Sequence, residues 1–135
     1  MRLVVDANVL VSAALSRHGP PARLIERWLD GAVELVLCPR LLSEVERTLR
    51  GPKLRSRVPK GPAEEFVALL RDRAEVVADP TETPPMRSED PDDDYVIALA
   101  AREHARIASG DAHLLKMAGA IPVLSPRAVL ELLAS

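Results

Sequence analysis

Short apolar runs rich in β-branched residues alternate with longer amphipathic runs along this sequence, and this alternation restricts the fold more than any other feature. It predicts repeated strand–helix units and therefore a parallel sheet. The first run, Leu3-Val4-Val5, is continuously apolar and ends at Asp6, as expected of a strand that is buried on both faces. The predicted strands cover residues 3–5, 34–38, 75–77, 106–108 and 121–124.

The amphipathic runs between these strands predict the helices, and proline and glycine mark several of their ends. Gly19-Pro20-Pro21 breaks the first helix, and Gly51-Pro52 stops the third. Asp90-Pro91 is typical of a helix start, with an acid at the N-cap and proline in the first turn. The prolines at 80, 84 and 85 predict a loop over residues 79–89. The predicted helices cover residues 9–16, 22–29, 40–49, 63–73, 91–104, 112–117 and 126–133.

Composition excludes several other classes of protein. The 135 residues are 47% hydrophobic with a formal net charge of −2, which suits one globular α/β domain with a core of its own. No apolar run approaches the ~20 residues of a membrane-spanning helix, so we expect a cytoplasmic protein with no membrane partner. Aromatic residues make up only 2%, which argues against proteins that stack single-stranded bases on several rings. The lone Cys38 excludes both a disulfide framework and a cysteine-built zinc site.

Charge is unevenly distributed along the chain. Residues 47–60 contain basic side chains and no acid, whereas residues 79–94 are rich in Asp and Glu with Arg87 as the sole base. A basic stretch can bind phosphates and an acidic one can bind a metal ion. The alternative is a solvated helix end followed by a polar linker.

Two acids follow predicted strands, where open parallel sheets collect their ligands. Asp6 closes the first strand and Asp111 follows the fourth, in Ser109-Gly110-Asp111. A buried carboxylate at such a place needs a partner. Each acid could instead cap the helix that begins after it.

Two further acids lie on predicted helices. Asp94 is the only charged residue in the apolar stripe of the helix after Pro91, and helical spacing turns Asp92 and Asp93 toward solvent. In the helix that follows Pro39, Glu44 and Glu46 flank the apolar stripe on opposite sides, and periodicity does not choose between them. Carboxylates that converge on one pocket repel each other unless a hard cation such as Mg²⁺ or Mn²⁺ joins them.

Four segments, in this order, resemble the motifs of PIN-domain proteins, and they cover nearly the whole chain. The segments are Val4-Val5-Asp6-Ala7-Asn8-Val9-Leu10-Val11-Ser12-Ala13 followed by Gly19-Pro20-Pro21-Ala22-Arg23-Leu24, Cys38-Pro39-Arg40-Leu41-Leu42-Ser43-Glu44-Val45, Asp90-Pro91-Asp92-Asp93-Asp94-Tyr95-Val96-Ile97-Ala98-Leu99-Ala100, and Ser109-Gly110-Asp111-Ala112-His113-Leu114-Leu115. The most similar branch is the toxins of bacterial and archaeal toxin–antitoxin pairs, the VapC group. Serine at position 109 stands where threonine is common, and the hydroxyl is kept.

The resemblance implies a single PIN-like nuclease domain over residues 1–135, a three-layer α/β/α sandwich around a parallel, roughly five-stranded sheet. It assigns Asp6, Glu44, Asp94 and Asp111 as catalytic residues that hold Mg²⁺ or Mn²⁺, and Asn8 and Ser109 as their supports. It thereby favours Glu44 over Glu46, and Asp94 over its neighbours. Our hypothesis for the RNA-binding residues is the basic stretch after Glu44, namely Arg47, Arg50, Lys53, Arg55 and Arg57.

The function implied is a metal-dependent endoribonuclease, the toxin of a pair, with RNA as substrate, a small antitoxin as partner and a tendency to form homodimers. Two alternatives stay open: a housekeeping RNA-processing nuclease, and a non-catalytic module that binds RNA or protein. A phosphoryl-transfer protein with Asp6 as nucleophile is disfavoured, because Asp6-Ala7-Asn8 lacks the second acid of a D-x-D turn.

Overall fold

One parallel sheet organises the chain, and the first strand in the sequence lies at its centre. In the computed structural model, which describes residues 1–134, the strand order is β3-β2-β1-β4-β5. All four strand pairs are parallel. The strands are β1 (Arg2–Val5), β2 (Glu34–Leu37), β3 (Glu75–Val76), β4 (Arg106–Ala108) and β5 (Val123–Leu124). The predicted five-stranded parallel sheet is therefore confirmed.

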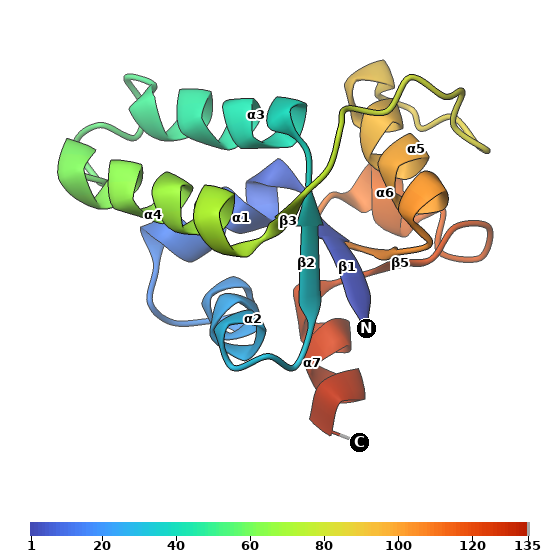
Figure 1. Ribbon diagram of the computed structural model, residues 1–135, viewed down its shortest axis with the longest axis horizontal. Helices are drawn as coiled ribbons and strands as arrows, with labels where there is room; N and C mark the ends of the chain where they lie inside the picture. Colours follow the sequence, from blue (N-terminus) through green and yellow to red (C-terminus); the bar gives the residue numbers. More distant parts are fainter. Residues whose placement is uncertain (135) are drawn as a thin grey trace.

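Helices flank the sheet on both sides (Figure 1). The helices are α1 (Ala7–Leu15), α2 (Pro20–Leu29), α3 (Pro39–Arg50), α4 (Lys60–Arg73), α5 (Asp94–Glu103), α6 (Ala112–Leu115) and α7 (Pro126–Ala134), with a 3₁₀ turn η1 (Pro91–Asp93) before α5. In Figure 1, α1 to α4 lie on one side of strands β1 and β2, and α5 and α6 lie on the other. The three-layer α/β/α architecture expected from the resemblance is confirmed. Among residues 1–134, none of the helices is long and apolar enough to cross a membrane.

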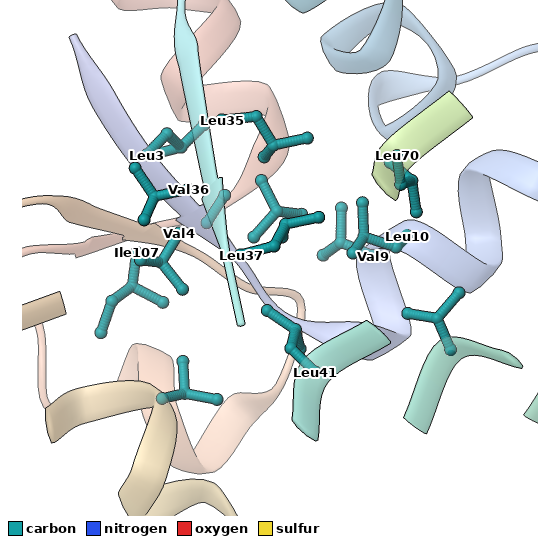
Figure 2. Close-up of a cluster of buried hydrophobic side chains, with 14 of the residues drawn as sticks. Leu3, Val4, Val9, Leu10, Leu35, Val36, Leu37, Leu41, Leu70 and Ile107 are labelled. Carbon is teal, nitrogen blue, oxygen red and sulfur yellow. The ribbon is translucent and has the colours of Figure 1, made fainter. Parts of the chain in front are cut away.

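The central strands β1, β2 and β4 carry the core because both of their faces are covered. Leu3, Val4 and Ile107 are completely buried, and they meet in the cluster of Figure 2 with side chains from β2 and α1. Continuous apolar strands are stable only where helices cover both sides of the sheet. The uninterrupted hydrophobic runs in the sequence therefore correspond to the middle layer of the fold.

One helix start differs from the prediction in a way that matters for the site. Asp90 caps as predicted, since its carboxylate accepts a hydrogen bond from the backbone N–H of Asp92 at 3.0 Å. The residues after it form the tighter η1 turn, however, and α5 begins only at Asp94. A 3₁₀ turn has three residues per turn instead of 3.6, so the side chains of residues 91–93 point in other directions than a continuous α-helix would give them.

Candidate functional site

Asp6 lies at the carboxyl edge of the sheet, beside the end of a neighbouring strand. Parallel pairing of β1 with β4 sets Val5 opposite Ala108, so Asp6 and Ser109 are the next residues on the two strands. The Ser109 hydroxyl donates a hydrogen bond to Asp6 Oδ2, and the Val9 N–H donates to Asp6 Oδ1 at 3.2 Å. Asp6 is 5% exposed and Ser109 is fully buried. The Asp6 carboxylate is therefore held in one orientation at the start of α1.

Ser109 also connects Asp6 with Asp111. Its hydroxyl oxygen accepts a hydrogen bond from the Asp111 N–H at 3.0 Å, while Asp111 Oδ1 caps α6 by accepting from the His113 N–H at 2.8 Å. The cap anticipated for Asp111 is thus present, and it leaves the carboxylate near Asp6. Burial raises the pKa of Asp6, and the charge of Asp111 raises it further, against the hydrogen bonds from Ser109 and Val9.

Asp93 joins these two acids, and its predicted exposure to solvent is wrong. The side chain is partly buried, and burial together with repulsion from Asp111, Asp90 and Asp6 raises the pKa of its carboxyl to about 7. Within residues 1–134, Asp93 Oδ2 is buried and forms no well-aligned hydrogen bond, and a side chain within reach of the Asp93 carboxyl is another acid, Asp111. The η1 turn accounts for the difference, because it rotates Asp93 away from the direction that α-helical spacing predicts.

Asp94, the acid that the sequence favoured, has other partners. It is 9% exposed, and its Oδ1 accepts a hydrogen bond from the Ser88 N–H at 2.8 Å. Its Oδ2 lies 3.3 Å from Arg87 Nη1. A third contact holds the same segment: His113 Nδ1 on α6 is 2.5 Å from Glu89 Oε2. In this structure Asp94 therefore fastens the segment before η1 to the start of α5.

Glu44 and Glu46, which periodicity left undecided, point to different surroundings. Glu46 pairs with Arg50 at 2.9 Å and with Arg71 of α4 at 3.7 Å. Glu44 lies 3.9 Å from Arg40 Nε and close enough to the hydroxyl of Tyr95, on α5, for its charge to help burial raise the pKa of that hydroxyl. Glu46 thus belongs to the α3–α4 interface, and Glu44 faces α5.

The acids fit a hard cation in their chemistry, although they are not gathered as a finished site. Across residues 1–134, no three His, Cys, Asp or Glu side chains form a group placed to hold a metal ion. Asp6, Asp93 and Asp111 nevertheless repel one another, and the buried Asp93 oxygen lacks a partner. Carboxylate oxygens are the ligands that Mg²⁺ and Mn²⁺ prefer, and a cation would offset this repulsion. Asn8, the proposed support at the start of α1, is exposed.

The basic residues proposed to bind RNA lie at the C-terminal end of α3 and in the turn between α3 and α4. A groove of about 490 Å³ opens there, with Arg50, Arg55, Lys60 and Arg71 on its rim and an apolar floor. Arg50 is engaged by Glu46 at 2.9 Å and by Glu64 at 3.8 Å. The other four residues of the hypothesis, Arg47, Lys53, Arg55 and Arg57, are exposed.

Sequence reasoning missed three residues at this site: Asp93, Arg40 and Tyr95. The Arg40 guanidinium lies over the Tyr95 ring, 4.1 Å from its centroid. An available signal for Asp93 was the cap at Asp90, because proline directly after a capping acid is compatible with a 3₁₀ first turn. No spacing in the sequence connects Arg40 with Tyr95, which come from different helices.

The fold and this edge of the sheet define a class: three-layer α/β proteins with a carboxylate-rich site beyond the central strand. The chain belongs to the PIN domain family, whose model, described as "PIN domain", matches residues 2–113. It is similar in structure to VapBC2 from Rickettsia felis, whose crystal structure was determined bound to a DNA fragment from the VapBC2 promoter. That likeness has a TM-score of 0.61 at 12% identity and covers 93% of this chain and 98% of that one.

A second solved structure of the same fold is FitAcB from Neisseria gonorrhoeae. The TM-score is 0.55 at 17% identity, and the match covers 93% of this chain and 98% of that one. No curated protein matches the sequence. At these identities the two structures establish the fold, and the family model establishes the family.

Proposed function

We propose that this PIN-domain protein is a metal-dependent endoribonuclease that hydrolyses RNA phosphodiester bonds and acts as the toxin of a toxin–antitoxin pair. The observation that carries the proposal is the buried, unpartnered Asp93 oxygen beside Asp6 and Asp111 at the carboxyl edge of the sheet. Buried polar atoms in folded proteins almost always have a hydrogen-bond partner, so a buried carboxylate oxygen that lacks one needs an explanation. A cation held between these acids supplies it.

Asp6, Asp93 and Asp111 would hold Mg²⁺ or Mn²⁺, with Glu44 as a further carboxylate from the α3 side. A divalent cation bound there would supply positive charge that offsets the charge developing on the phosphate. It would also lower the pKa of the attacking water. Ser109 fixes Asp6 by its hydrogen bond, so this ligand needs no reorganisation before the cation binds. Asp94 supports the site indirectly, because it anchors the segment that carries Ser88.

The basic turn after α3 is our proposed path for the RNA backbone. Backbone contacts position a nucleic acid without reading its sequence, and they make binding depend on salt. Arg50, which two glutamates neutralise, contributes less in this proposal than Arg55 and Arg57. The toxin role rests on the resemblance to the VapC group and on the likeness to VapBC2, and it implies a small protein antitoxin as partner. The proposal includes homodimer formation, which rests only on the resemblance to the VapC group.

Metal dependence tests the proposal first. We expect purified protein to cut a mixed panel of transfer, ribosomal and messenger RNAs at discrete positions with Mn²⁺ or Mg²⁺, because the acids need a cation to bind a phosphate. Excess EDTA should abolish the cuts, and Mn²⁺ added back should restore them. Cutting that persists in EDTA would point to a contaminating nuclease, and binding of RNA without cutting under any metal would favour the non-catalytic module.

Salt dependence of RNA binding tests the basic turn. Replacing Arg55 and Arg57 with alanine should make the slope of log K against log[salt] less negative by about 1.4, since each lost phosphate contact on a single strand removes ~0.7 from its magnitude. Fluorescence anisotropy with a labelled RNA measures the slope. The matched control replaces Arg23 and Arg27 of α2, which line a different groove beside α7. Equal slopes for the wild type and the Arg55/Arg57 variant would remove this turn from the interface.

A further inference from the structure

A pair of side chains connects the first turns of α3 and α5. Arg40, on α3, places its guanidinium 4.1 Å from the centre of the Tyr95 ring, on α5. The Arg40 backbone N–H donates to Asp79 Oδ1 at 2.8 Å, which holds the start of α3. A guanidinium over an aromatic face is an attractive contact that fixes both groups.

Glu44 is the third member of this contact. It lies one helical turn after Arg40, and its carboxylate is 3.9 Å from Arg40 Nε, at the long end of ion-pair distances. Its charge also acts on the Tyr95 hydroxyl, as the raised pKa of that group indicates. Arg40 and Tyr95 thus face the same carboxylate from two helices.

The Tyr95 hydroxyl is the unusual feature here. Tyr95 is 7% exposed, and in the part of the chain from 1 to 134 its buried hydroxyl forms no well-aligned hydrogen bond, although the Glu44 carboxylate lies within reach of it. Burying a hydroxyl without a partner is costly, and phenylalanine would fill the same apolar space without that cost. The nearby acceptor that could take its hydrogen is the Glu44 carboxylate. Two residues before Tyr95 stands Asp93, so the same turn of chain carries an acid of the site.

We propose that Tyr95 and Arg40 are positioning residues that hold the Glu44 carboxylate toward the acidic site, with the Tyr95 hydroxyl as hydrogen-bond donor. This inference rests on the proposed function, because it gives Glu44 its place beside Asp6, Asp93 and Asp111. Arg40 keeps the carboxylate near α5 by its charge, and Tyr95 selects its direction. Neither residue contacts the substrate in this arrangement.

A double-mutant cycle on metal binding tests the arrangement. Tyr95→Phe keeps the ring and its contact with Arg40 and removes only the hydroxyl. We expect Tyr95→Phe to weaken Mn²⁺ binding by about tenfold, the value of one hydrogen bond to a charged group, and Glu44→Gln, which also removes the carboxylate charge, to weaken it at least as much, in isothermal titration calorimetry. The double variant should bind no more weakly than Glu44→Gln alone, because the two changes remove the same interaction. Multiplying losses, or normal binding by Tyr95→Phe, would overturn the proposal.

A spectroscopic readout separates positioning from a merely structural role. Tyr95 is the only tyrosine in the chain, so the tyrosine absorption band, after subtraction of the Tyr95→Phe spectrum, reports on this hydroxyl. Adding Mg²⁺ should shift the band in the wild type and in Glu46→Gln, the matched control on α3, but not in Glu44→Gln. A shift that survives Glu44→Gln would contradict the assigned partner.

The two hypotheses fail in different ways. A wild type that neither binds Mn²⁺ nor cuts RNA would defeat the proposed function itself. A wild type that binds Mn²⁺, cuts RNA and is unaffected by Tyr95→Phe would defeat only the positioning role.

Discussion

Replacing Asp93 with asparagine is expected to lower metal-dependent RNA cleavage at least about a hundredfold and to raise the Tm of the metal-free protein. The loss of activity follows because an amide replaces a carboxylate that would hold the cation, and that cation would offset several kcal/mol of charge on the phosphate. The gain in stability follows because burial and three neighbouring acids penalise the charged form of Asp93 in the folded state, raising its pKa to about 7. In mildly alkaline buffer the wild type carries this charge, and asparagine does not.

The size of the stability gain is roughly a few degrees, measured by differential scanning calorimetry with EDTA present. Added Mn²⁺ should raise the Tm of the wild type and leave the variant unchanged, since a ligand that binds only the folded state stabilises it. Asp92→Asn is the matched control, because Asp92 is the exposed neighbour in the same turn. Asp94→Asn should lower the Tm, since Asp94 holds Ser88 and Arg87. Full activity in Asp93→Asn with loss in Asp94→Asn would return the role to Asp94.

Replacing Ile107 with alanine is expected to cost about 2–5 kcal/mol in the free energy of unfolding. Ile107 is completely buried in β4, opposite Val4 of β1 and Val123 of β5, so the missing atoms leave a cavity in the core on the face of the sheet that its side chain covers. Urea denaturation followed by circular dichroism measures the loss as a lower midpoint with an unchanged m-value.

The control for this prediction lies at the edge of the same sheet. Val76, in β3, is 39% exposed, and its replacement by alanine should cost less than about 1 kcal/mol. Equal losses at positions 76 and 107 would mean that burial at the centre of the sheet is not the main source of stability. Ile107→Ala should also reduce cleavage, because β4 carries Ser109 to Asp6.

The central strands could be predicted from sequence because both of their faces are buried, whereas the two residues of the edge strand β3 are exposed. A strand such as Leu3-Val4-Val5 needs no knowledge of its neighbours to be recognised, since any covering layer demands the same apolar side chains. The order of the strands is different. Nothing in the residues of β1 says that it pairs with β2 on one side and β4 on the other, so the site at its end came from the resemblance and the topology together.

The site residues at the strand ends could be predicted, because the position of a residue along a strand decides the direction of its side chain. Asp6 and Ser109 follow paired strands, and their contact is a consequence of register. Asp93 was not predictable in this way, because its direction depends on whether the turn at residue 91 is 3₁₀ or α-helical, a difference of about 20° of rotation per residue. Glu44 and Glu46 are equivalent by periodicity, and the resemblance alone favoured Glu44. In the structure Glu46 pairs with Arg71 of α4, whereas the charge of Glu44 acts on Tyr95 of α5.

The central place of β1 sets when the protein can become active as it is made. Synthesis produces β1 early, but its partner β4, and the serine that fixes Asp6, come 103 residues later. The Asp6 segment therefore leaves the ribosome long before β4 and Ser109 are available to hold Asp6. A chain that ends before β4 lacks both the strand pairing and the acid at 111. Nascent and truncated chains lack parts of this edge of the sheet, so the activity proposed for the site would require nearly the whole domain to be synthesised first.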